Sequence, residues 1–471
     1  MPGPLPNPDE AFAPFAARMA AAGVPDVAVR AFAAAYAALR EGATGTLPSD
    51  QALPLDALPS SEDLGQYAET GIRALDRTVV IKLNGGLGTS MGMRGPKSLV
   101  PVRDALSFLD LTVRQVLHLR GQQDARLPLV LMNSFATRGA TLAALAAYPE
   151  LSAQDVPLEF VQHQVPKVDA ATLLPAEWPD DPQKTWCPPG HGDLFAALLS
   201  SGLLPALLTA GYRFAFVSNI DNLGAVLDAS LLGWLATERI PFAMEVADRT
   251  AADRKGGHLA RRPDGGLVLR ELAQCPPEEL EAFQDVLRYR YFNTNSLWFD
   301  LMRLDAILAA HGKVLPLPLI RNCKPIDPTQ PGSPPVFQLE TAMGSAIAVI
   351  PGARAVRVPR TRFAPVKRTD DLLVLRSDAY EVDPSWQVVP ARSLVAEGRP
   401  VPRVVLDERY FGALAAMEAR FPHGVPSLIA CRSLVVRGDV RFGRDVVVRG
   451  DVVLDAGEGE LGIPDGAVLE G

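Results

Sequence analysis

The segment Thr78–Ser98 constrains the fold of this chain more than any other part of the sequence. It starts with an apolar, β-branched run, Thr78–Lys82, and continues into a stretch that holds five glycines. Glycine has no side chain, so the backbone N–H groups around it can come close to an anion. The spacing fits neither the GxGxxG fingerprint of dehydrogenases nor the P-loop of Walker-type NTPases. The pattern therefore predicts a strand followed by an anion-binding loop of another kind.

Short apolar or β-branched runs alternate with helical patterns between residues 74 and 385. The expected strands cover residues 78–82, 127–132, 158–162, 214–217 and 241–246, and the expected helices cover residues 107–119, 193–199 and 227–236. Such alternation predicts an α/β fold in which helices cover the faces of a sheet. Ligands of such folds bind beyond the carboxyl ends of the strands, so we expect the functional residues in the turns that follow them.

The N-terminal part of the chain has a different pattern. Residues 9–41 are rich in alanine and carry an apolar stripe, and Pro25 divides them into two expected helices. The segment 42–61 contains several prolines and glycines without periodicity, which is typical of a linker. We therefore expect an N-terminal helical segment at residues 1–65, a central domain at 66–385 and a C-terminal domain at 386–471.

The tail of the chain contains a short repeat. The sequence Val-Arg-Gly-Asp-Val stands at Val436–Val440 and again at Val448–Val452, twelve residues later. Twelve residues are two units of the six-residue repeat that builds a parallel β-helix, so the tail is expected to form one. Two ordinary strands with glycine turns are the alternative explanation.

Composition and charge exclude several classes of protein. The 471 residues are 48% hydrophobic and 21% charged, as in folded proteins, and the net charge of −8 argues against a nucleic-acid-binding protein. The four cysteines are far apart, which argues against a zinc ribbon and favours a reducing compartment, the cytoplasm. The first residues lack the pattern of a secretory signal. Pro205 interrupts the uncharged stretch Leu194–Tyr212, so we expect buried core segments there rather than a membrane span.

A carboxylate stands just beyond the expected strand at residues 214–217. The chain continues as Ser-Asn-Ile-Asp-Asn, which places Asp221 in the following turn. Mg²⁺ takes oxygen ligands and usually binds one or two carboxylates together with substrate phosphates. Asp221 is therefore a candidate Mg²⁺ ligand, and an Asx turn that caps the next helix is the alternative.

The segment Trp186–Asp193 is a proline- and glycine-rich turn that leads into an expected helix. Asp193 is a favourable N-cap residue. A helix N-terminus next to Gly190 and Gly192 suits the recognition of an anion or a carbonyl group. The position of His191 between these two glycines favours contact with a ligand.

Polar side chains suited to sugar hydroxyls occur further along the chain. Asn293 and Asn295 are two residues apart in an expected strand, so they should lie on the same face. Glu340 precedes an expected helix and could simply cap it. The proline-stiffened segment Arg360–Lys367 adds cations, which favours a phosphate clamp over a solvated basic loop.

Seven short motifs occur in the order of one known family. They are Lys82–Gly92, Gly95–Ser98, Pro188–Asp193, Ser218–Gly224, Phe292–Trp298, Gln338–Gly344 and Pro365–Lys367. Together they resemble the eukaryotic-type UTP–glucose-1-phosphate uridylyltransferase family, the UDP-glucose pyrophosphorylases. The resemblance implies an α/β fold with a GT-A, Rossmann-like nucleotidyltransferase catalytic domain and a C-terminal left-handed parallel β-helix. It also implies that UTP and glucose 1-phosphate are the substrates and Mg²⁺ the cofactor, with in-line attack on the α-phosphorus of UTP.

The resemblance implies a role for each matching residue. Lys97 and Lys367 would be catalytic, because they would hold the phosphates as charge develops, and Asp221 would hold Mg²⁺. The residues implied in nucleotide binding are Leu83, Asn84, Gly85, Gly86, Gln162, Gly190 and Asn219. The residues implied in sugar-phosphate binding are His191, Asn293, Asn295 and Glu340.

Some alternatives stay open at this point. The same chemistry on galactose 1-phosphate or N-acetylglucosamine 1-phosphate is one, and a catalytically inactive sugar-nucleotide sensor is another. The chain departs from the family pattern at Met93–Arg94 and at His163–Val165. Pro464 and the Asp-Gly pair after it should cap the tail. We therefore expect a monomer or a weak homo-oligomer without nucleic-acid or membrane partners.

Overall fold

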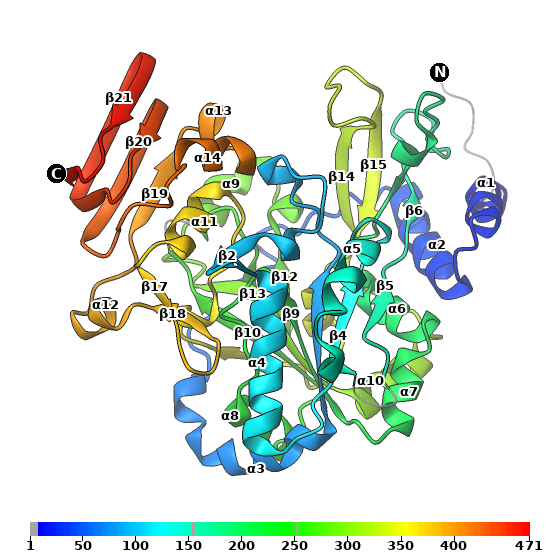
Figure 1. The fold of residues 1–471 in the computed structure, drawn as a ribbon. Helices are drawn as coiled ribbons and strands as arrows, with labels where there is room; N and C mark the ends of the chain where they lie inside the picture. The colour runs from blue at the N-terminus through cyan, green and yellow to red at the C-terminus, as the bar shows by residue number, and fades with distance from the viewer. Residues whose placement is uncertain (1–7, 153–155, 251–252) are drawn as a thin grey trace.

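A nine-stranded sheet runs through the centre of the computed structural model, which describes residues 8–152, 156–250 and 253–471 (Figure 1). Seven of its strands lie in the order β12 (Leu267–Arg270), β11 (His258–Arg261), β13 (Tyr291–Asp300), β9 (Phe214–Asn219), β1 (Thr78–Asn84), β4 (Leu129–Asn133) and β5 (Glu159–Val161). β10 (Phe242–Asp248) pairs with β13 and with β16 (Arg354–Arg357). β1, β4, β5 and β9 pair in parallel, and β13 runs antiparallel to β9. The five strands expected from the sequence are therefore confirmed as members of one sheet.

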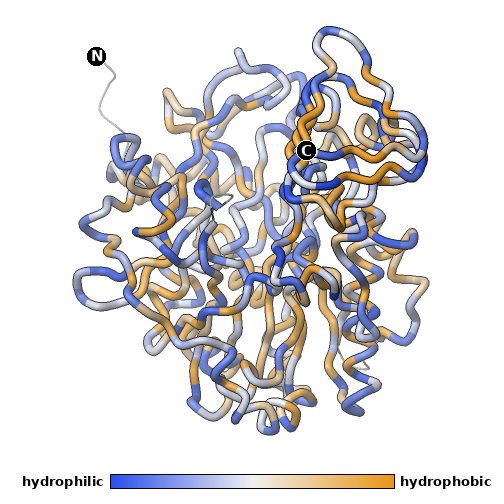
Figure 2. The backbone as a smooth tube through the Cα atoms, turned by 90° about the vertical axis from the view of Figure 1, so that its left-hand side faces the viewer, coloured by the Kyte–Doolittle hydropathy of each residue, from blue (hydrophilic) through white to orange (hydrophobic). Residues whose placement is uncertain are grey.

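Helices cover both faces of this sheet, because successive strand residues point to opposite sides. In β1, Val79 and Ile81 pack with α6, α7 and α10, whereas Val80 packs with α3, α4 and α8. Their bounds are α3 (Ala68–Ala74), α4 (Phe108–Gln123), α6 (Leu194–Ser200), α7 (Leu203–Thr209), α8 (Ala229–Thr237) and α10 (Leu301–Ala310). The predicted helices are confirmed as α4, α6 and α8. Figure 2 shows hydrophobic, orange stretches of the backbone running through the middle of the molecule.

The uncharged stretch around Pro205 forms part of the core. Within the described ranges no single helix is long and apolar enough to cross a membrane, and one bent pair, His191–Ser200 with Leu203–Thr209, passes that test by length and composition only. Leu194 and Leu204 in this pair are fully buried against the sheet. The expectation of buried core segments is thus confirmed.

The N-terminal region forms a helical hairpin, α1 (Pro8–Ala21) and α2 (Asp26–Arg40), with Pro25 between the helices as expected. Its core is a cluster of aromatic rings, in which the ring centroids of Phe15 and Tyr36 are 4.7 Å apart. The same cluster includes Val165 and Leu339 of the central part of the chain. The hairpin is therefore packed against the central region rather than held away from it.

Smaller elements surround the central sheet. A three-stranded sheet contains β14 (Ile320–Pro325), β15 (Pro335–Glu340) and β7 (Val168–Asp169). Three two-stranded sheets pair β2 (Pro101–Arg103) with β3 (Leu106–Ser107), β6 (Val165–Pro166) with β8 (Trp186–Cys187), and β17 (Tyr380–Val382) with β18 (Val388–Pro390). The other α-helices of the described residues are α5 (Phe135–Leu145), α9 (Leu280–Gln284), α11 (Thr369–Arg376), α12 (Arg392–Ala396), α13 (Glu408–Phe411) and α14 (Leu414–Arg420).

The tail contributes four strands that pair in parallel, in chain order: β19 (Arg403–Leu406), β20 (Cys431–Phe442), β21 (Val447–Ile463) and β22 (Val468–Glu470). Val436 lies opposite Leu454, 18 residues further on, and Val448 lies opposite Leu469, 21 residues further on. The two copies of the repeat are therefore in neighbouring strands, but they are not stacked on each other. The twelve-residue spacing of the repeat is therefore not the distance between paired strands.

The hydrophobic core of the tail extends into the glycine loop. Met91 is fully buried in the same cluster as Phe411 and Met417. Gly92 has a φ of +66°, and a Cβ built on it would lie 3.0 Å from the Cβ of Ala413. The tip of the loop therefore packs directly on the C-terminal part of the chain, so this core spans the predicted boundary at residue 386.

Candidate functional site

The glycine loop folds back on itself directly after β1. The N–H of Gly88 donates to the carbonyl of Gly95 at 3.3 Å, and the N–H of Lys97 donates to the carbonyl of Gly86 at 3.2 Å. These bonds close the loop at its base. They return Lys97 to the carboxyl end of β1, next to the residues where the loop begins.

Gln162 lies against the start of this loop. A Cβ built on Gly85 would come within 2.8 Å of the Gln162 Oε1, so the Gln162 amide in this position lies directly against Gly85. The N–H of Gln162 donates to the carbonyl of Asn133 at 2.8 Å, which fixes the amide beyond the end of β5. Nothing lies within 4 Å of the corresponding position on Gly86. Two predicted nucleotide-binding residues, Gly85 and Gln162, are thus neighbours.

Asn84 points away from the loop. Its Nδ2 donates to Asn133 Oδ1 at 2.8 Å and to Thr141 Oγ1 at 2.9 Å, and its side chain is buried between β4 and α5. Leu83 lies in register with Asn219 across β1 and β9. Asn84 can therefore offer only its backbone to a ligand, and its side chain holds the loop to the sheet.

Lys97 and Asp221 form an ion pair at the ends of β1 and β9. The Lys97 Nζ is 2.6 Å from Asp221 Oδ2 and also donates to the carbonyl of Val366. Both side chains are only partly exposed. The predicted catalytic lysine and the predicted metal ligand are therefore in direct contact.

The segment that carries Lys367 is fixed against the turn after β9. The carbonyl of Asp221 accepts from the N–H of Val366 at 3.3 Å, and the side chain of Asn222 bonds to the backbone of Arg362 and of Ala364. These contacts bring Lys367, Lys97 and Asp221 to one end of the sheet, although they come from distant parts of the sequence. The predicted phosphate-binding groups are thus brought together.

The donors around Asp221 suit one kind of metal site only. Among the residues that the structure describes, no group of three or more His, Cys, Asp and Glu side chains could hold a metal ion. A closed protein cage of the kind that holds a structural metal is therefore not formed there. A single carboxylate matches the way Mg²⁺ is held in many nucleotide sites, where phosphates and water supply the other ligands. The residues present fit Mg²⁺ in that form.

The turn before α6 can be built only with glycine. Gly190 has a φ of +79°, and a Cβ on it would lie 2.4 Å from the carbonyl oxygen of Thr341. The N–H of Gly192 donates to this carbonyl at 2.8 Å, and the N–H of Thr341 donates to Pro189 at 3.0 Å. These two hydrogen bonds join the turn to the segment after β15, so Gly190 lies beside Glu340.

His191 is a neutral hydrogen-bond donor in this turn. Its Nδ1 accepts from the N–H of Met343 at 3.0 Å, and burial lowers its pKa to about 4. Because Nδ1 is an acceptor, the ring proton of the neutral imidazole is on Nε2. His191 can therefore donate to a ligand without carrying a charge at neutral pH.

A β-bulge places the two predicted asparagines together. Val246 of β10 pairs with Asn293, whereas the preceding Glu245 pairs with Ser296, so two residues of β13 are left over between these pairs. Asn295 has a φ of +58°, which is unusual for a residue other than glycine. Asn293 Nδ2 donates to Asn295 Oδ1 at 3.0 Å. The two amides therefore lie together as predicted, although the strand contains a bulge that was not predicted.

Glu271 lies between these asparagines and Lys367, and it was not predicted from the sequence. Its side chain bonds to Asn293, and desolvation raises its pKa against the opposing influence of the Lys367 ammonium. A Cβ built on Gly344 would lie 3.3 Å from Asn293 Nδ2, so Asn293 lies close to Gly344. The residue before Gly344 is Met343, whose N–H donates to His191. The glutamate stands outside every motif, immediately after β12, where only the three-dimensional arrangement identifies it.

Lys82 is buried beneath the site. Its Nζ donates to Ser218 Oγ at 2.7 Å and to the carbonyl of Ala225 at 2.6 Å. Desolvation, reinforced by the nearby Arg362, lowers its pKa to about 7 although Glu245 and Asp221 act in the opposite direction. Lys82 supports the strand ends below Asp221 and is not exposed to a ligand.

Comparison with known proteins decides the family. A family model for UTP–glucose-1-phosphate uridylyltransferase matches residues 31–449. The chain belongs to the UTP–glucose-1-phosphate uridylyltransferase family. A relative of that name from Solanum tuberosum is 41% identical over 90% of this chain and 86% of its own length. A probable uridylyltransferase of the same name from Schizosaccharomyces pombe is 41% identical over 84% of this chain and 76% of its own length.

Solved structures of the uridylyltransferase family have the same fold. A variant of UDP-glucose pyrophosphorylase from Leishmania major, crystallised with UDP-glucose, superposes with a TM-score of 0.92 and 43% identity, covering 98% of both chains. UDP-glucose phosphorylase from Trypanosoma brucei superposes with a TM-score of 0.88 and 41% identity, covering 98% of this chain and all of its own. The mixed α/β fold and the family membership predicted from the seven motifs are thereby confirmed.

Proposed function

We propose that this protein transfers a uridylyl group from UTP to glucose 1-phosphate and releases pyrophosphate. The observation that carries the proposal is the meeting of Lys97, Asp221 and the segment of Lys367 beside the glycine loop. Family relatives carry this activity in their names, and one related structure contains UDP-glucose. The alternatives are the same reaction with another sugar 1-phosphate and an inactive sugar-nucleotide sensor. The experiment below distinguishes them from the proposed function.

The proposed reaction needs charge stabilisation and not a general base. An oxygen of the sugar phosphate is already anionic, and it forms a bond to the α-phosphorus of UTP. The bond from this phosphorus to the bridging oxygen breaks, and its electron pair leaves with pyrophosphate. Cations held in place before the reaction lower the barrier most effectively. We assign this function to Lys97 and Lys367.

Mg²⁺ is the cofactor that we propose for this site. When bound, it would supply positive charge to the triphosphate oxygens. Asp221 is the residue that we assign to hold it. Because Asp221 is also paired with Lys97, the carboxylate keeps the lysine ammonium near the same oxygens.

We assign the two substrates to two sides of this charged centre. The backbone of Leu83–Gly86, with Gln162, Gly190 and Asn219, would hold the nucleotide. The neutral Nε2–H of His191 would donate to the sugar phosphate. The remaining sugar contacts would come from Asn293, Asn295, Glu340 and, in addition to the residues predicted from the sequence, Glu271.

The test is an assay of pyrophosphate release from UTP with glucose 1-phosphate, galactose 1-phosphate or N-acetylglucosamine 1-phosphate. We expect glucose 1-phosphate to be used best and EDTA to stop turnover. The Lys97→Ala variant should be inactive, whereas replacement of the exposed Lys324 by Ala should have no effect. Absence of pyrophosphate release with all three sugars would favour the sensor, and full activity in EDTA would remove the metal assignment.

We infer further that the four C-terminal strands are coils of a left-handed β-helix. Their parallel pairing at spacings of 18 and 21 residues supports this arrangement. A crystal structure would decide the handedness of the coil. The monomeric or weakly associated state and the cytoplasmic location stay predictions, and light scattering should give a mass near 50.4 kDa for a monomer.

A further inference from the structure

Asp193 accepts two hydrogen bonds from a single residue, His163. The backbone N–H of His163 donates to Asp193 Oδ2 at 2.7 Å, and the ring Nδ1 is 2.7 Å from Asp193 Oδ1. The two side chains are only 7% and 3% exposed. A carboxylate that accepts two short hydrogen bonds in a buried place fixes the orientation of both partners strongly.

This pair connects the two halves of the proposed site. His163 follows Gln162, which lies against the nucleotide end of the glycine loop. Asp193 ends the turn that carries His191, which we assign to the sugar phosphate on the other side of the charged centre. The carboxylate is therefore the direct side-chain link between the end of β5 and this turn.

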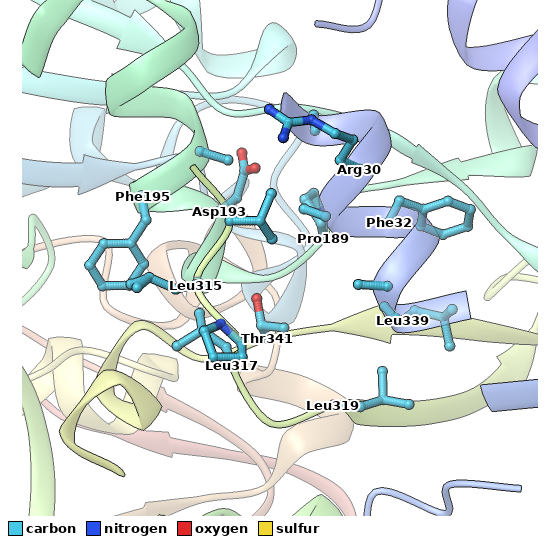
Figure 3. A pocket seen from close by; sticks show the side chains of 18 of the residues that line it. Arg30, Phe32, Pro189, Asp193, Phe195, Leu315, Leu317, Leu319, Leu339 and Thr341 are labelled. Carbon is cyan, nitrogen blue, oxygen red and sulfur yellow. The ribbon is translucent and has the colours of Figure 1, made fainter. Parts of the chain in front are cut away.

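One side of the turn borders a cavity. A cavity of about 580 Å³ lies between α2, the segment 311–319 and the turn, and its lining includes Pro189, Gly192 and Asp193. Figure 3 shows Asp193 and Pro189 at this cavity, with the apolar side chains of Phe195 and Leu315 nearby. The turn is packed against Thr341 on one side and borders this cavity on the other, so on the cavity side its position depends on its hydrogen bonds.

The pair also contacts a serine, but it is not placed for nucleophilic catalysis. The Ser200 Oγ is 2.9 Å from the His163 Nε2, so serine, histidine and aspartate are in line. Ser200 is the last residue of α6, where the carbonyl groups of the helix point outward and disfavour an oxyanion. The arrangement orients the histidine ring, with Nδ1–H toward Asp193 and Nε2 toward the serine hydroxyl.

We propose that His163 and Asp193 are positioning residues that set the distance between the nucleotide side and the sugar-phosphate side of the site. The proposal rests on the proposed function. Removing the Nδ1–H bond should leave each half able to bind its own group while the two groups are no longer aligned.

The test compares two amide variants of His163. In His163→Asn the amide nitrogen takes the place of Nδ1 and can still donate to Asp193. In His163→Gln the longer side chain carries the amide to the place of Nε2, toward Ser200. We expect the Gln variant to lose about ten- to a hundredfold in kcat, as misplacement of substrates by about 1 Å does elsewhere, and the Asn variant to stay within about threefold of the wild type. Ser201→Ala, at the exposed neighbour of Ser200 that bonds to the carbonyl of Ala197 and not to His163, is the matched control and should be unchanged.

Binding gives a second readout that does not depend on turnover. UDP-glucose spans both halves of the site and UTP lacks the sugar, so calorimetry should show that His163→Gln weakens UDP-glucose more than UTP. The proposal would be overturned if the Asn and Gln variants lost kcat and affinity equally, or if these losses ran in parallel with a lower melting temperature. Either result would show a purely structural role. A wild-type protein that binds UDP-glucose but releases no pyrophosphate would refute the proposed function alone, because the two affinities still test the link.

Discussion

The buried amine of Lys82 makes a quantitative prediction about stability. Its side chain is 3% exposed, and its pKa is lowered from 10.5 to about 7 because burial disfavours the charged form. In the unfolded chain the amine returns to the ordinary value, so between these two pH values the unfolded state binds more protons than the folded state. The free energy of unfolding must then rise with pH across this window, and below it the full cost of burying the charge is present.

The size of the effect follows from the two pKa values. Lowering the pKa from 10.5 to about 7 corresponds to about 5 kcal/mol at low pH, since a tenfold change in the proton affinity is about 1.4 kcal/mol. Between about pH 7 and about pH 9 roughly 2 kcal/mol of this cost should disappear. Lys82→Met removes the titrating group and therefore this pH dependence. The substitution also removes the hydrogen bonds to Ser218 and Ala225, and the resulting decrease in the free energy of unfolding should change little over this pH range.

Urea unfolding at several pH values measures this difference. Trp298 is a suitable reporter, because its ring centroid lies 4.5 Å from that of Phe216, over which the Lys82 ammonium is placed. The wild type should gain about 2 kcal/mol relative to Lys82→Met from about pH 7 to about pH 9. Lys324→Met, at an exposed site, is the control and should show no such trend. A difference that stays constant over this range would refute the reasoning and show that water reaches the amine.

Three further outcomes are expected in the site. Lys97→Ala and Lys367→Ala should each lower kcat by about a hundredfold or more and should raise KM by a smaller factor. A change in KM alone in steady-state assays would show that these lysines contribute only to ground-state binding. Asn295→Ala and Glu340→Ala should weaken glucose 1-phosphate by about 1–3 kcal/mol and UTP less, and equal losses by calorimetry would place them outside the sugar pocket. Burial lowers the pKa of His191 to about 4, so its ring should stay neutral above about pH 5. The ratio of the affinities of the wild type and of His191→Gln for glucose 1-phosphate should therefore be constant between about pH 5 and neutral pH.

Local patterns in the sequence were sufficient to predict the central sheet. Thr78–Lys82 and the other apolar runs are short, rich in β-branched residues and bounded by turns, and burial on both faces leaves few alternatives to a strand. The order of those strands in the sheet could not be predicted in this way. It depends on pairings such as Leu83 with Asn219, which join residues far apart in the chain.

Details of the site depend on events that the sequence pattern does not encode. The bulge at Asn295 changes the strand register without any glycine or proline to mark it. Glu271 is brought to Asn293 by the pairing of β11 with β12 and β13, so no local signal distinguishes it from a surface glutamate. Asn84 matched the motif, yet its side chain faces the interior, because alternate strand residues point to opposite sides of the sheet.

The contact of Met91 and Gly92 with the tail limits how this protein can be dissected or recombined. A truncation at residue 385 would expose Met91, which is fully buried beside Phe411 and Met417, to water. A residue larger than glycine at position 92 would meet the Ala413 Cβ and would need a left-handed backbone conformation, so the loop tip and the tail are fitted to each other here. A chimera that exchanges the tail for that of a relative should therefore take the loop tip from the same relative.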